Sequence, residues 1–280
     1  MRRHCNGIET YQVDAFTDRP FTGNPAAVCL LESVLPVRVM RRIAAEMNLS
    51  ETAFLSPIDG NFDTASRFRL RWFTPLVEVP LCGHATLASA AVLFQEKGNR
   101  QQTLLFETKS GTLTAGQEGK KLKLDFPVNP PHPCAVPTSL LDGLNLTEPA
   151  AGWLSEEAEM LLLPLPEHRD VISVRPDYGK LLSVKNRGCI QGLIVTSKGP
   201  EGFDFCSRYF GPWEGINEDP VTGSAHTVLA PYWTAVLGKN RFRALQASER
   251  TGILDVRLQA NGRVELAGVA RVILKGELYI

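Results

Sequence analysis

Two segments of the chain place residues that could do chemistry next to a glycine that opens a helix. They are Glu78-Val-Pro-Leu-Cys-Gly-His-Ala85 and Glu218-Asp-Pro-Val-Thr-Gly-Ser-Ala225, which share the pattern E-x-P-x-x-G-x-A. A helix N-terminus exposes unpaired N–H groups and the positive end of the helix dipole. Two such ends, at Gly83 and Gly223, would bind a small anion such as a carboxylate if they met across an interdomain cleft. Two ordinary turns that need glycine for backbone reasons explain the pattern equally well.

The two segments differ at the positions that matter most for catalysis. The first carries Cys82 and His84, where the second carries Thr222 and Ser224, and the second alone carries an added acid, Asp219. An aspartate before a proline is most often a turn or cap residue. A single histidine is more often a structural residue than a catalytic one. Taken one at a time, these side chains therefore favour structural roles.

Glu51 is a candidate general acid/base. It lies in Asn48-Leu-Ser-Glu-Thr-Ala-Phe54, where it follows a predicted helix and opens an apolar stretch. Such a carboxylate is usually exposed on a loop. In a dry pocket, however, desolvation would raise its pKa and suit it to take and return a proton near neutral pH.

Many short strands and three helices must position these residues. Strict alternation predicts half-buried strands at 67–72, 121–126, 254–258 and 263–266. Short alternating strands of this kind are typical of antiparallel sheets with one solvated face. One amphipathic helix is predicted from Pro36 onward, and two helices that are apolar nearly all round follow Gly83 and Gly223.

The spacing of the two matching segments predicts two domains of the same design. Gly83 and Gly223 are 140 residues apart, half of the 280-residue chain, and each leads into a buried helix. We place the first domain at 1–127, joined by a C-terminal strand at 271–280, and the second at 128–270. The proline-rich stretch 127–137 is the predicted linker.

Composition excludes several classes of function. Thirty Lys and Arg balance thirty Asp and Glu, so phosphate-driven nucleic-acid binding and attachment to an anionic membrane are not expected. The start of the chain lacks the features of a signal peptide, and the longest apolar run is too short to span a bilayer. Six scattered cysteines without a C-x-x-C pair indicate reduced thiols in the cytoplasm.

Taken together, the motifs make the chain resemble the phenazine-biosynthesis PhzF-like family of the diaminopimelate epimerase-like superfamily. The likeness is greatest to the animal phenazine-biosynthesis-like-domain proteins. It covers nearly the whole chain and rests on both E-x-P segments, on the Glu51 segment and on four further motifs: Phe21-Thr-Gly-Asn-Pro-Ala-Ala-Val28, Arg71-Trp-Phe-Thr-Pro75, Ser207-Arg-Tyr-Phe210 and Gln246-Ala-Ser-Glu-Arg250. One position departs from the family pattern: Thr251 follows Arg250 where Gly is commoner.

The resemblance implies an α/β (α+β) fold of two pseudo-symmetric domains, each a curved, mostly antiparallel sheet around a central helix. It also implies a cofactor-independent isomerase, because the family prototype moves one proton between carbons of a cyclic dihydro-hydroxyanthranilate. The family's acid/base glutamate falls on Glu51, and its partner histidine and aspartate fall on His84 and Asp219. Contacts with the substrate carboxylate are expected from Ser50, Gly83, Gly223 and Ser224.

The same resemblance implies a small carboxylic acid as substrate, a homodimer, and neither a cofactor nor a metal. Three alternatives stay open. A racemase with two thiols would need a second cysteine where Thr222 stands, and a metal hydrolase would have to use His84 and His226, whose spacing matches no ligand motif. A catalytically silent protein that keeps the fold to bind protein partners would have no need of Glu51, His84 and Asp219 together.

Overall fold

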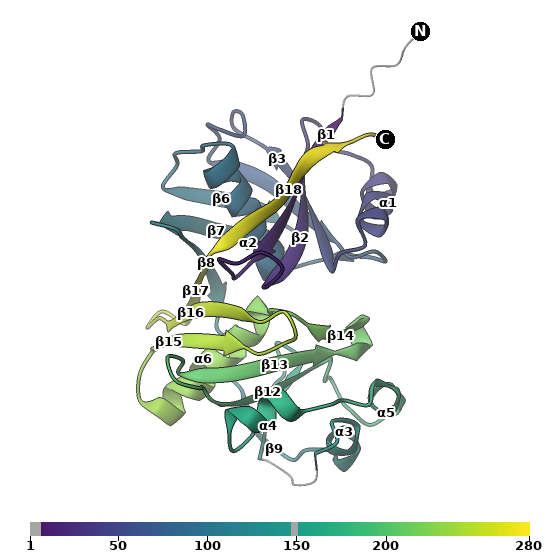
Figure 1. The fold of residues 1–280 in the computed structure, drawn as a ribbon, viewed down its shortest axis with the longest axis vertical. Coiled ribbons are helices and arrows are strands. Elements are labelled where there is room, and N and C mark those ends of the chain that lie inside the picture. The colour runs from purple at the N-terminus through teal and green to yellow at the C-terminus, as the bar shows by residue number, and fades with distance from the viewer. Residues whose placement is uncertain (1–6, 147–150) are drawn as a thin grey trace. The chain divides into compact units, whose positions relative to one another are not determined.

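The computed structural model describes residues 7–146 and 151–280 (Figure 1). Contacts within the chain divide it into two compact units: unit 1 is Met1–Asp125 with Ala267–Ile280, and unit 2 is Phe126–Leu266. The domain boundaries predicted from the sequence lie after residues 127 and 270. The last strand, β18 (Ala270–Leu278), pairs antiparallel with the first, β1 (Ile8–Ala15), so the two ends of the chain are joined in unit 1.

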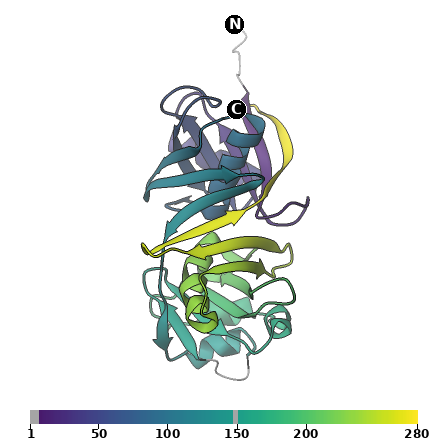
Figure 2. The ribbon, with the colours of Figure 1, turned by 90° about the vertical axis from the view of Figure 1, so that its left-hand side faces the viewer.

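Unit 1 is a curved sheet in the order β18-β1-β2-β3-β4-β6-β7-β8, with the short β5 added to β4. Neighbouring strands are antiparallel except for the pairs β2/β3 and β4/β6. The central helix α2 packs against the strands β1, β2, β3, β7 and β18, and α1 packs on β3 and β4 (Figures 1 and 2). The remaining bounds are β2 (Asn24–Leu30), β3 (Glu51–Pro57), β4 (Arg67–Phe73), β5 (Glu78–Val79), β6 (Thr103–Thr108), β7 (Gly111–Glu118), β8 (Lys121–Pro127), α1 (Val37–Met47), α2 (Gly83–Ala91) and the π-helical turn η1 (Val92–Glu96).

Unit 2 repeats this design in the order β9-β10-β11-β12-β13-β15-β16, with β14 added to β13. Its parallel pairs, β11/β12 and β13/β15, occur at the same steps of the sequence as those of unit 1. The bounds are β9 (His132–Cys134), β10 (Gly152–Ser155), β11 (Met160–Pro164), β12 (Gly192–Lys198), β13 (Phe205–Gly211), β14 (Ile216–Asp219), β15 (Arg241–Gln246), β16 (Gly252–Leu258), β17 (Arg263–Gly268), α3 (Thr138–Gly143), α4 (His168–Ser173), α5 (Tyr178–Ser183), η2 (Pro212–Glu214) and α6 (Gly223–Leu237). The predicted fold class, two pseudo-symmetric and mostly antiparallel units with a central helix, is confirmed.

The two central helices are buried because their sequences are apolar or small on nearly every side. Residues 84–91 of α2 are all buried, and eight residues of α6 are buried, including the fully buried His226. Small residues let strands approach the helix closely, and larger ones fill the remaining space. In unit 2, Trp233 stacks on Phe205 with ring centroids 5.6 Å apart, and its indole N–H donates to the Thr196 hydroxyl at 3.1 Å. These helices therefore hold the backbone at their N-termini rigidly.

The four strands and three helices predicted from periodicity are confirmed. In the first helix Met40, Ile43 and Ala44 are buried, and Pro36 stands just before the helix as its cap residue. The stretch 127–137, predicted as a linker, contains β9, which pairs with β10 inside unit 2. Across residues 7–146 and 151–280, no helix has both the length and the apolar character needed to cross a bilayer.

Thr251, the residue that departs from the family pattern, has a φ of +56°. A branched side chain in this left-handed region costs about 1–2 kcal/mol, which glycine avoids. We therefore expect Thr251→Gly to stabilise the protein by about 1 kcal/mol, after the greater flexibility of glycine in the unfolded chain is counted. Thermal unfolding measures this change. Thr251→Ala keeps the Cβ and should recover little of the gain; a lower melting temperature for Thr251→Gly would contradict the expectation.

Candidate active site

Glu51 is the first residue of β3 and is buried, with 7% of its surface exposed. The interpretation of Glu51 as an exposed loop residue is therefore wrong. β3 runs parallel to β2 with Ala26 opposite Glu51, so two adjacent strands fix the backbone at this point. Its carboxylate oxygen Oε2 lies 3.2 Å from Nε2 of His84, the second residue of α2. Two elements that are distant in sequence thus bring the predicted base and its predicted partner into contact.

His84 is a neutral imidazole in contact with Glu51. Its Nδ1 lies 3.1 Å from the side-chain amide nitrogen of Asn24, which donates, so Nδ1 accepts and the proton is on Nε2. Burial lowers the pKa of His84 to about 3, which keeps the ring neutral at pH 7. The hydroxyl of Ser50 also lies 3.3 Å from Nε2 and 3.4 Å from the Asn24 carbonyl oxygen. Glu51, His84 and Ser50 therefore form one local network in unit 1.

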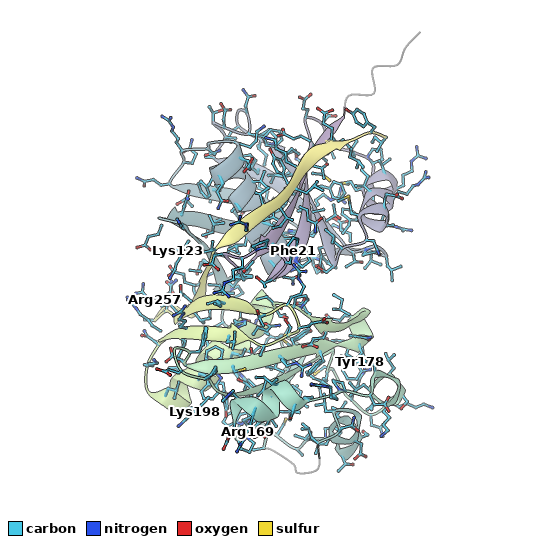
Figure 3. All side chains as sticks on the ribbon, in the orientation of Figure 1. Phe21, Lys123, Arg169, Tyr178, Lys198 and Arg257 are labelled. Carbon is cyan, nitrogen blue, oxygen red and sulfur yellow. The ribbon has the colours of Figure 1, made fainter. Side chains whose placement is uncertain are left out.

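Asn24 was not among the predicted site residues, although it belongs to one of the motifs that carry the family resemblance. It begins β2 and is fully buried. The loop before it needs glycine, because Gly23 has a φ of +70° and a Cβ there would lie 2.3 Å from the carbonyl oxygen of Ala15. On the same loop the backbone N–H of Phe21 donates to the Asp14 carboxylate at 2.9 Å, while its ring is exposed (Figure 3). The turn thus positions the amide that selects the tautomer of His84.

Cys82 adds a thiol to the same cluster. It is the residue before α2, it is 7% exposed, and its sulfur lies 3.5 Å from Nδ1 of His84. The thiol is not part of a disulfide. Sequence reasoning favoured a small buried residue over a nucleophile, and the position is buried as expected.

Both central helices begin without a hydrogen bond from a side-chain cap. The cap residues are Cys82 for α2 and Thr222 for α6, and the first helical residues are Gly83 and Gly223. In each unit a side chain four residues later bonds the carbonyl of the cap residue: the Thr86 hydroxyl donates to Cys82, and Nδ1 of His226 donates to Thr222. These bonds hold the first turn of each helix in place. The N–H groups of that first turn point away from the body of the helix.

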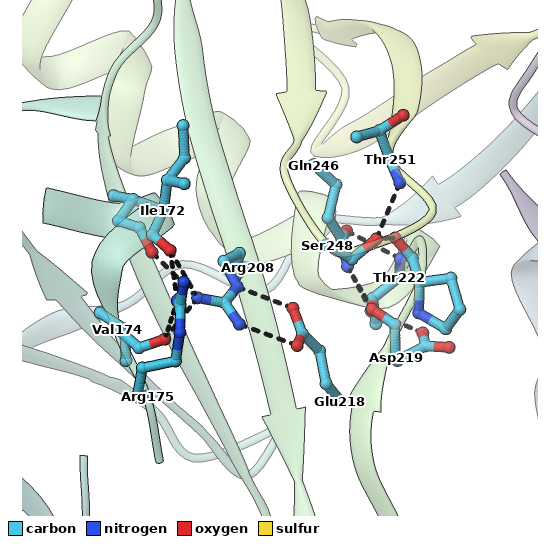
Figure 4. A network of polar contacts seen from close by, with 12 residues as sticks. Ile172, Val174, Arg175, Arg208, Glu218, Asp219, Thr222, Gln246, Ser248 and Thr251 are labelled. Carbon is cyan, nitrogen blue, oxygen red and sulfur yellow. Dashed lines mark hydrogen bonds and ion pairs between the residues drawn. The ribbon is translucent and has the colours of Figure 1, made fainter. Parts of the chain in front are cut away.

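In unit 2, Asp219 belongs to a buried network with Thr222 and Gln246 (Figure 4). The Thr222 hydroxyl donates to the Asp219 carboxylate at 2.6 Å, and the Gln246 amide donates to the Asp219 carbonyl at 2.9 Å. The Gln246 oxygen accepts from the Thr222 backbone N–H at 2.8 Å. Thr222 therefore orients the Asp219 carboxylate. Gln246, which sequence reasoning did not assign to the site, holds the loop that leads into α6.

The glutamate that opens each repeated segment is paired with an arginine on the preceding strand. Arg71 makes two hydrogen bonds to Glu78, at 2.7 and 2.8 Å, and Arg208 makes the same two bonds to Glu218 (Figure 4). Each guanidinium also lies over the phenylalanine two residues later. These glutamates therefore have a structural role, fixing the short strands β5 and β14 that lead to the helix starts.

The structure thus gathers the predicted residues in two groups. Unit 1 holds Ser50, Glu51, Gly83 and His84, and unit 2 holds Asp219, Gly223 and Ser224. Within unit 2, Ser224 is the second residue of α6 and is partly exposed. That both groups act on a single substrate stays a prediction.

The buried histidine of unit 2 predicts a dependence of stability on pH. Burial lowers the pKa of His226 from 6.5 to about 4, so the unfolded chain binds more protons between these pH values. Stability is therefore lost as the pH falls from 6.5 to 4, by up to about 3 kcal/mol for this residue. His226→Asn keeps a donor for the Thr222 carbonyl and removes the titration. Urea unfolding at several pH values should show a shallower loss in the variant; parallel curves would contradict this assignment.

The chain is similar to known proteins over nearly its whole length. The model of the family described as phenazine biosynthesis-like protein (PhzC-PhzF) matches residues 13–276. The phenazine biosynthesis-like domain-containing protein 1 of Mus musculus is 47% identical over 97% of this chain and 99% of its own length. An uncharacterized isomerase of Pseudomonas aeruginosa is 44% identical over 98% of this chain and 99% of its own. A crystal structure of a PhzF family protein from Enterococcus faecalis is 39% identical, with a TM-score of 0.90, and the match covers 98% of this chain and 100% of that one.

These matches define a protein with the diaminopimelate epimerase-like fold. The chain belongs to the phenazine biosynthesis-like PhzC-PhzF family. The resemblance inferred from the sequence motifs is confirmed, including the likeness to the animal proteins.

Proposed function

We propose that this protein is a cofactor-independent isomerase that moves a proton on a small carboxylic acid, with Glu51 as the acid/base. The observation that carries the proposal is the buried carboxylate of Glu51 beside a neutral imidazole, 3.2 Å away, at the start of a central helix. The isomerase named among the relatives supports an activity of this class.

The reaction requires one group to act first as a base and then as an acid. The Glu51 carboxylate takes a proton from a carbon that is alpha or vinylogous to the substrate carboxylate, and the electron pair left behind delocalises toward that carboxylate. The protonated Glu51 then returns the proton to a different carbon, so the double bond shifts and no atom is gained or lost. One carboxylate can perform both steps because its two protonation states alternate within the cycle.

His84 acts by positioning Glu51. Its Nε2 lies 3.2 Å from the carboxylate, and the ring stays neutral because burial lowers its pKa to about 3. A charged imidazolium would hold Glu51 in the ionised form and weaken it as a base. A neutral imidazole packed against the carboxylate limits its movement at a smaller cost in basicity.

The helix starts would stabilise the negative charge that builds up on the substrate. N–H groups that are already oriented lower the energy of an enolate-like intermediate without reorganisation during the reaction. In unit 1 the start of α2 at Gly83 would supply such groups, and Ser50 would contact the substrate carboxylate. In unit 2, Gly223 and Ser224 at the start of α6, together with Asp219, are proposed as further substrate contacts.

A racemase with two thiols is the weaker alternative. Such an enzyme needs a thiol at each helix start, and the residue that corresponds to Cys82 is Thr222, whose hydroxyl donates to Asp219. A hydroxyl engaged in this way is a poor base for a carbon acid. A silent interaction protein is the other alternative, and homodimerisation, protein partners and a cytoplasmic location stay predictions.

Proton NMR in D₂O tests the proposal. Wild-type protein and Glu51→Gln are incubated with a panel of unsaturated, hydroxy and amino carboxylic acids, and loss of C–H signals is followed together with any new isomer. The proposal predicts exchange and isomerisation of at least one acid by the wild type, and no detectable exchange by the variant. Undiminished exchange by Glu51→Gln would disprove the role of Glu51, and no reaction with any acid would favour the interaction protein.

A further inference from the structure

We propose that unit 1 binds a zinc-like divalent metal ion through Cys82, His84 and Glu51, and that the bound ion switches off proton transfer. The binding site rests on the geometry of these three side chains alone. The switching effect also rests on the proposed role of Glu51 as the base. Sequence spacing gave no sign of this site, because Glu51 is more than thirty residues away from the other two.

The positions of the three side chains are close to those of a metal site. One ligand atom from each residue lies within 4.8 Å of the other two. The Cys82 sulfur is 3.5 Å from Nδ1 of His84, and the Glu51 oxygen is 3.2 Å from Nε2. With Zn–S near 2.3 Å and Zn–N and Zn–O near 2.0 to 2.2 Å, the ligand atoms of a tetrahedral site lie about 3.3 to 3.6 Å apart. A histidine binds one ion through one ring nitrogen only, so the three ligand atoms, which lie up to 4.8 Å apart, must approach one another by about 1 Å.

The chemistry of the ligands selects a borderline-soft cation. A thiolate favours zinc or cobalt over magnesium and calcium, and a neutral imidazole suits the same ions. His84 is neutral, and its ring can bind the ion through Nε2 once the proton has moved from Nε2 to Nδ1. A thiolate and a carboxylate carry two negative charges, which a divalent ion neutralises. All three residues are buried, so this neutrality matters in a site of low dielectric constant.

A residue outside the three ligands, Asn24, would orient His84, and the fourth coordination position of the ion would stay open. When Nε2 binds the ion, the ring proton moves to Nδ1 and the Asn24 amide turns so that its oxygen accepts from Nδ1–H, the type of contact that orients a histidine ligand. Three protein ligands leave the fourth position of a tetrahedral ion for water or for a substrate carboxylate. Cys82 and His84 flank Gly83 at the start of α2, and Glu51 begins β3, so rigid elements carry all three ligands.

Metal binding and proton transfer exclude each other. When the ion binds, the thiol of Cys82 releases its proton to solvent and the sulfur forms a bond to the metal. The Glu51 carboxylate gives an electron pair to the same ion, and that pair is then no longer available to take a proton from substrate. The ion changes no oxidation state, so removal of the metal restores the base.

Titration of the metal-free protein with cobalt(II) tests the site, because a thiolate bound to cobalt gives a charge-transfer band in the near ultraviolet. We expect one cobalt per chain with this band. Cys82→Ser should lose the band and bind cobalt more than about 100-fold more weakly, since even outer-shell partners are worth about 10- to 100-fold. The matched control is Cys189→Ser, a partly exposed cysteine in unit 2, which should keep the band. Absence of the band from the wild type, or its retention in Cys82→Ser, would overturn the site.

The switching effect is tested with an acid that the wild type turns over. Zinc should inhibit the wild type and Cys189→Ser alike, a chelator should restore the rate, and Cys82→Ser should be less sensitive to zinc relative to its own rate without metal. A cobalt band without inhibition would overturn the switch. The cobalt spectrum needs no substrate, so its outcome is independent of whether the proposed isomerase activity is found.

Discussion

Glu51→Gln is expected to lower kcat for the isomerised acid by about 10² to 10⁴, the usual contribution of a general acid/base. Glutamine has nearly the same shape as glutamate, and its side-chain oxygen can keep the contact with Nε2 of His84. The substitution therefore removes the proton acceptor and leaves the packing in place. Because the lost interaction belongs to the transition state, KM should change much less than kcat. Steady-state kinetics with the purified proteins measures both parameters.

The control is Glu214→Gln, which replaces another hydrogen-bonded glutamate, this one solvent-exposed by surface area. Desolvation raises the pKa of Glu214, and its carboxylate accepts a hydrogen bond from the Tyr209 hydroxyl at 2.8 Å. It lies in unit 2, outside the proposed site. We expect its kcat to stay within about twofold of the wild-type value, because no proton transfer depends on it. Equal losses in both variants would show that loss of any hydrogen-bonded glutamate lowers the activity and would contradict a special role of Glu51.

Arg208→Met is expected to destabilise the protein by about 3–5 kcal/mol, the usual result of breaking a buried ion pair from one side. The guanidinium is nearly inaccessible, bonds both oxygens of Glu218, and donates to the backbone carbonyls of Val171, Ile172 and Val174. Methionine fills the volume and cannot donate, so the partly buried Glu218 carboxylate and the Val171 carbonyl lose the Arg208 donor. The carbonyls of Ile172 and Val174 also lose it but still accept from Arg175. Urea unfolding measures the loss.

The internal repeat provides the comparison for this prediction. Arg71 occupies the equivalent position in unit 1, but its side chain is 20% exposed, against 9% for Arg208. Its partner Glu78 also contacts Lys109 at 2.5 Å and keeps that contact when Arg71 is replaced. Arg71→Met should therefore cost clearly less than Arg208→Met. Equal losses, or the reverse order, would show that burial and the carbonyl contacts do not determine the stability of these pairs.

The repeat and its helices could be predicted from sequence because local signals determine them. Alternation with a period of two marks strands such as 67–72, and an apolar run after a glycine marks each central helix. The 140-residue offset between Gly83 and Gly223 predicted two similar units, and the strand pairings of the two units follow the same order. The strand and helix signals each lie within a short stretch of chain, and the repeat is recognised by comparing two such local stretches.

The contacts within the site could not be predicted, because they join residues that are far apart in the chain. Asn24 meets His84 across 60 residues, and Gln246 meets Thr222 across 24. The choice of tautomer for His84 follows from the first of these contacts. The arginine partners of the two glutamates in the repeated pattern were likewise not predicted, and Arg71 and Arg208 give these glutamates a structural role. The residue types were visible in the sequence, whereas their partners became visible only in the fold.

The burial of Glu51 is the feature on which the functional account depends, and sequence alone left it open. The segment around it could have been an exposed loop after α1 or the start of a strand. Parallel pairing with β2 and the contact with His84 make it a buried strand residue. A carboxylate kept from water beside a neutral imidazole is suited to exchange protons with a carbon acid.

A structure of the protein with its substrate, or with an unreactive analogue, tests the central claim most directly. The account predicts that the carbon that loses the proton lies within about 3.5 Å of a Glu51 oxygen, in line for transfer, with the substrate carboxylate at a helix start. A bound acid whose reacting carbon lies beyond reach of Glu51 and next to another base would contradict the account.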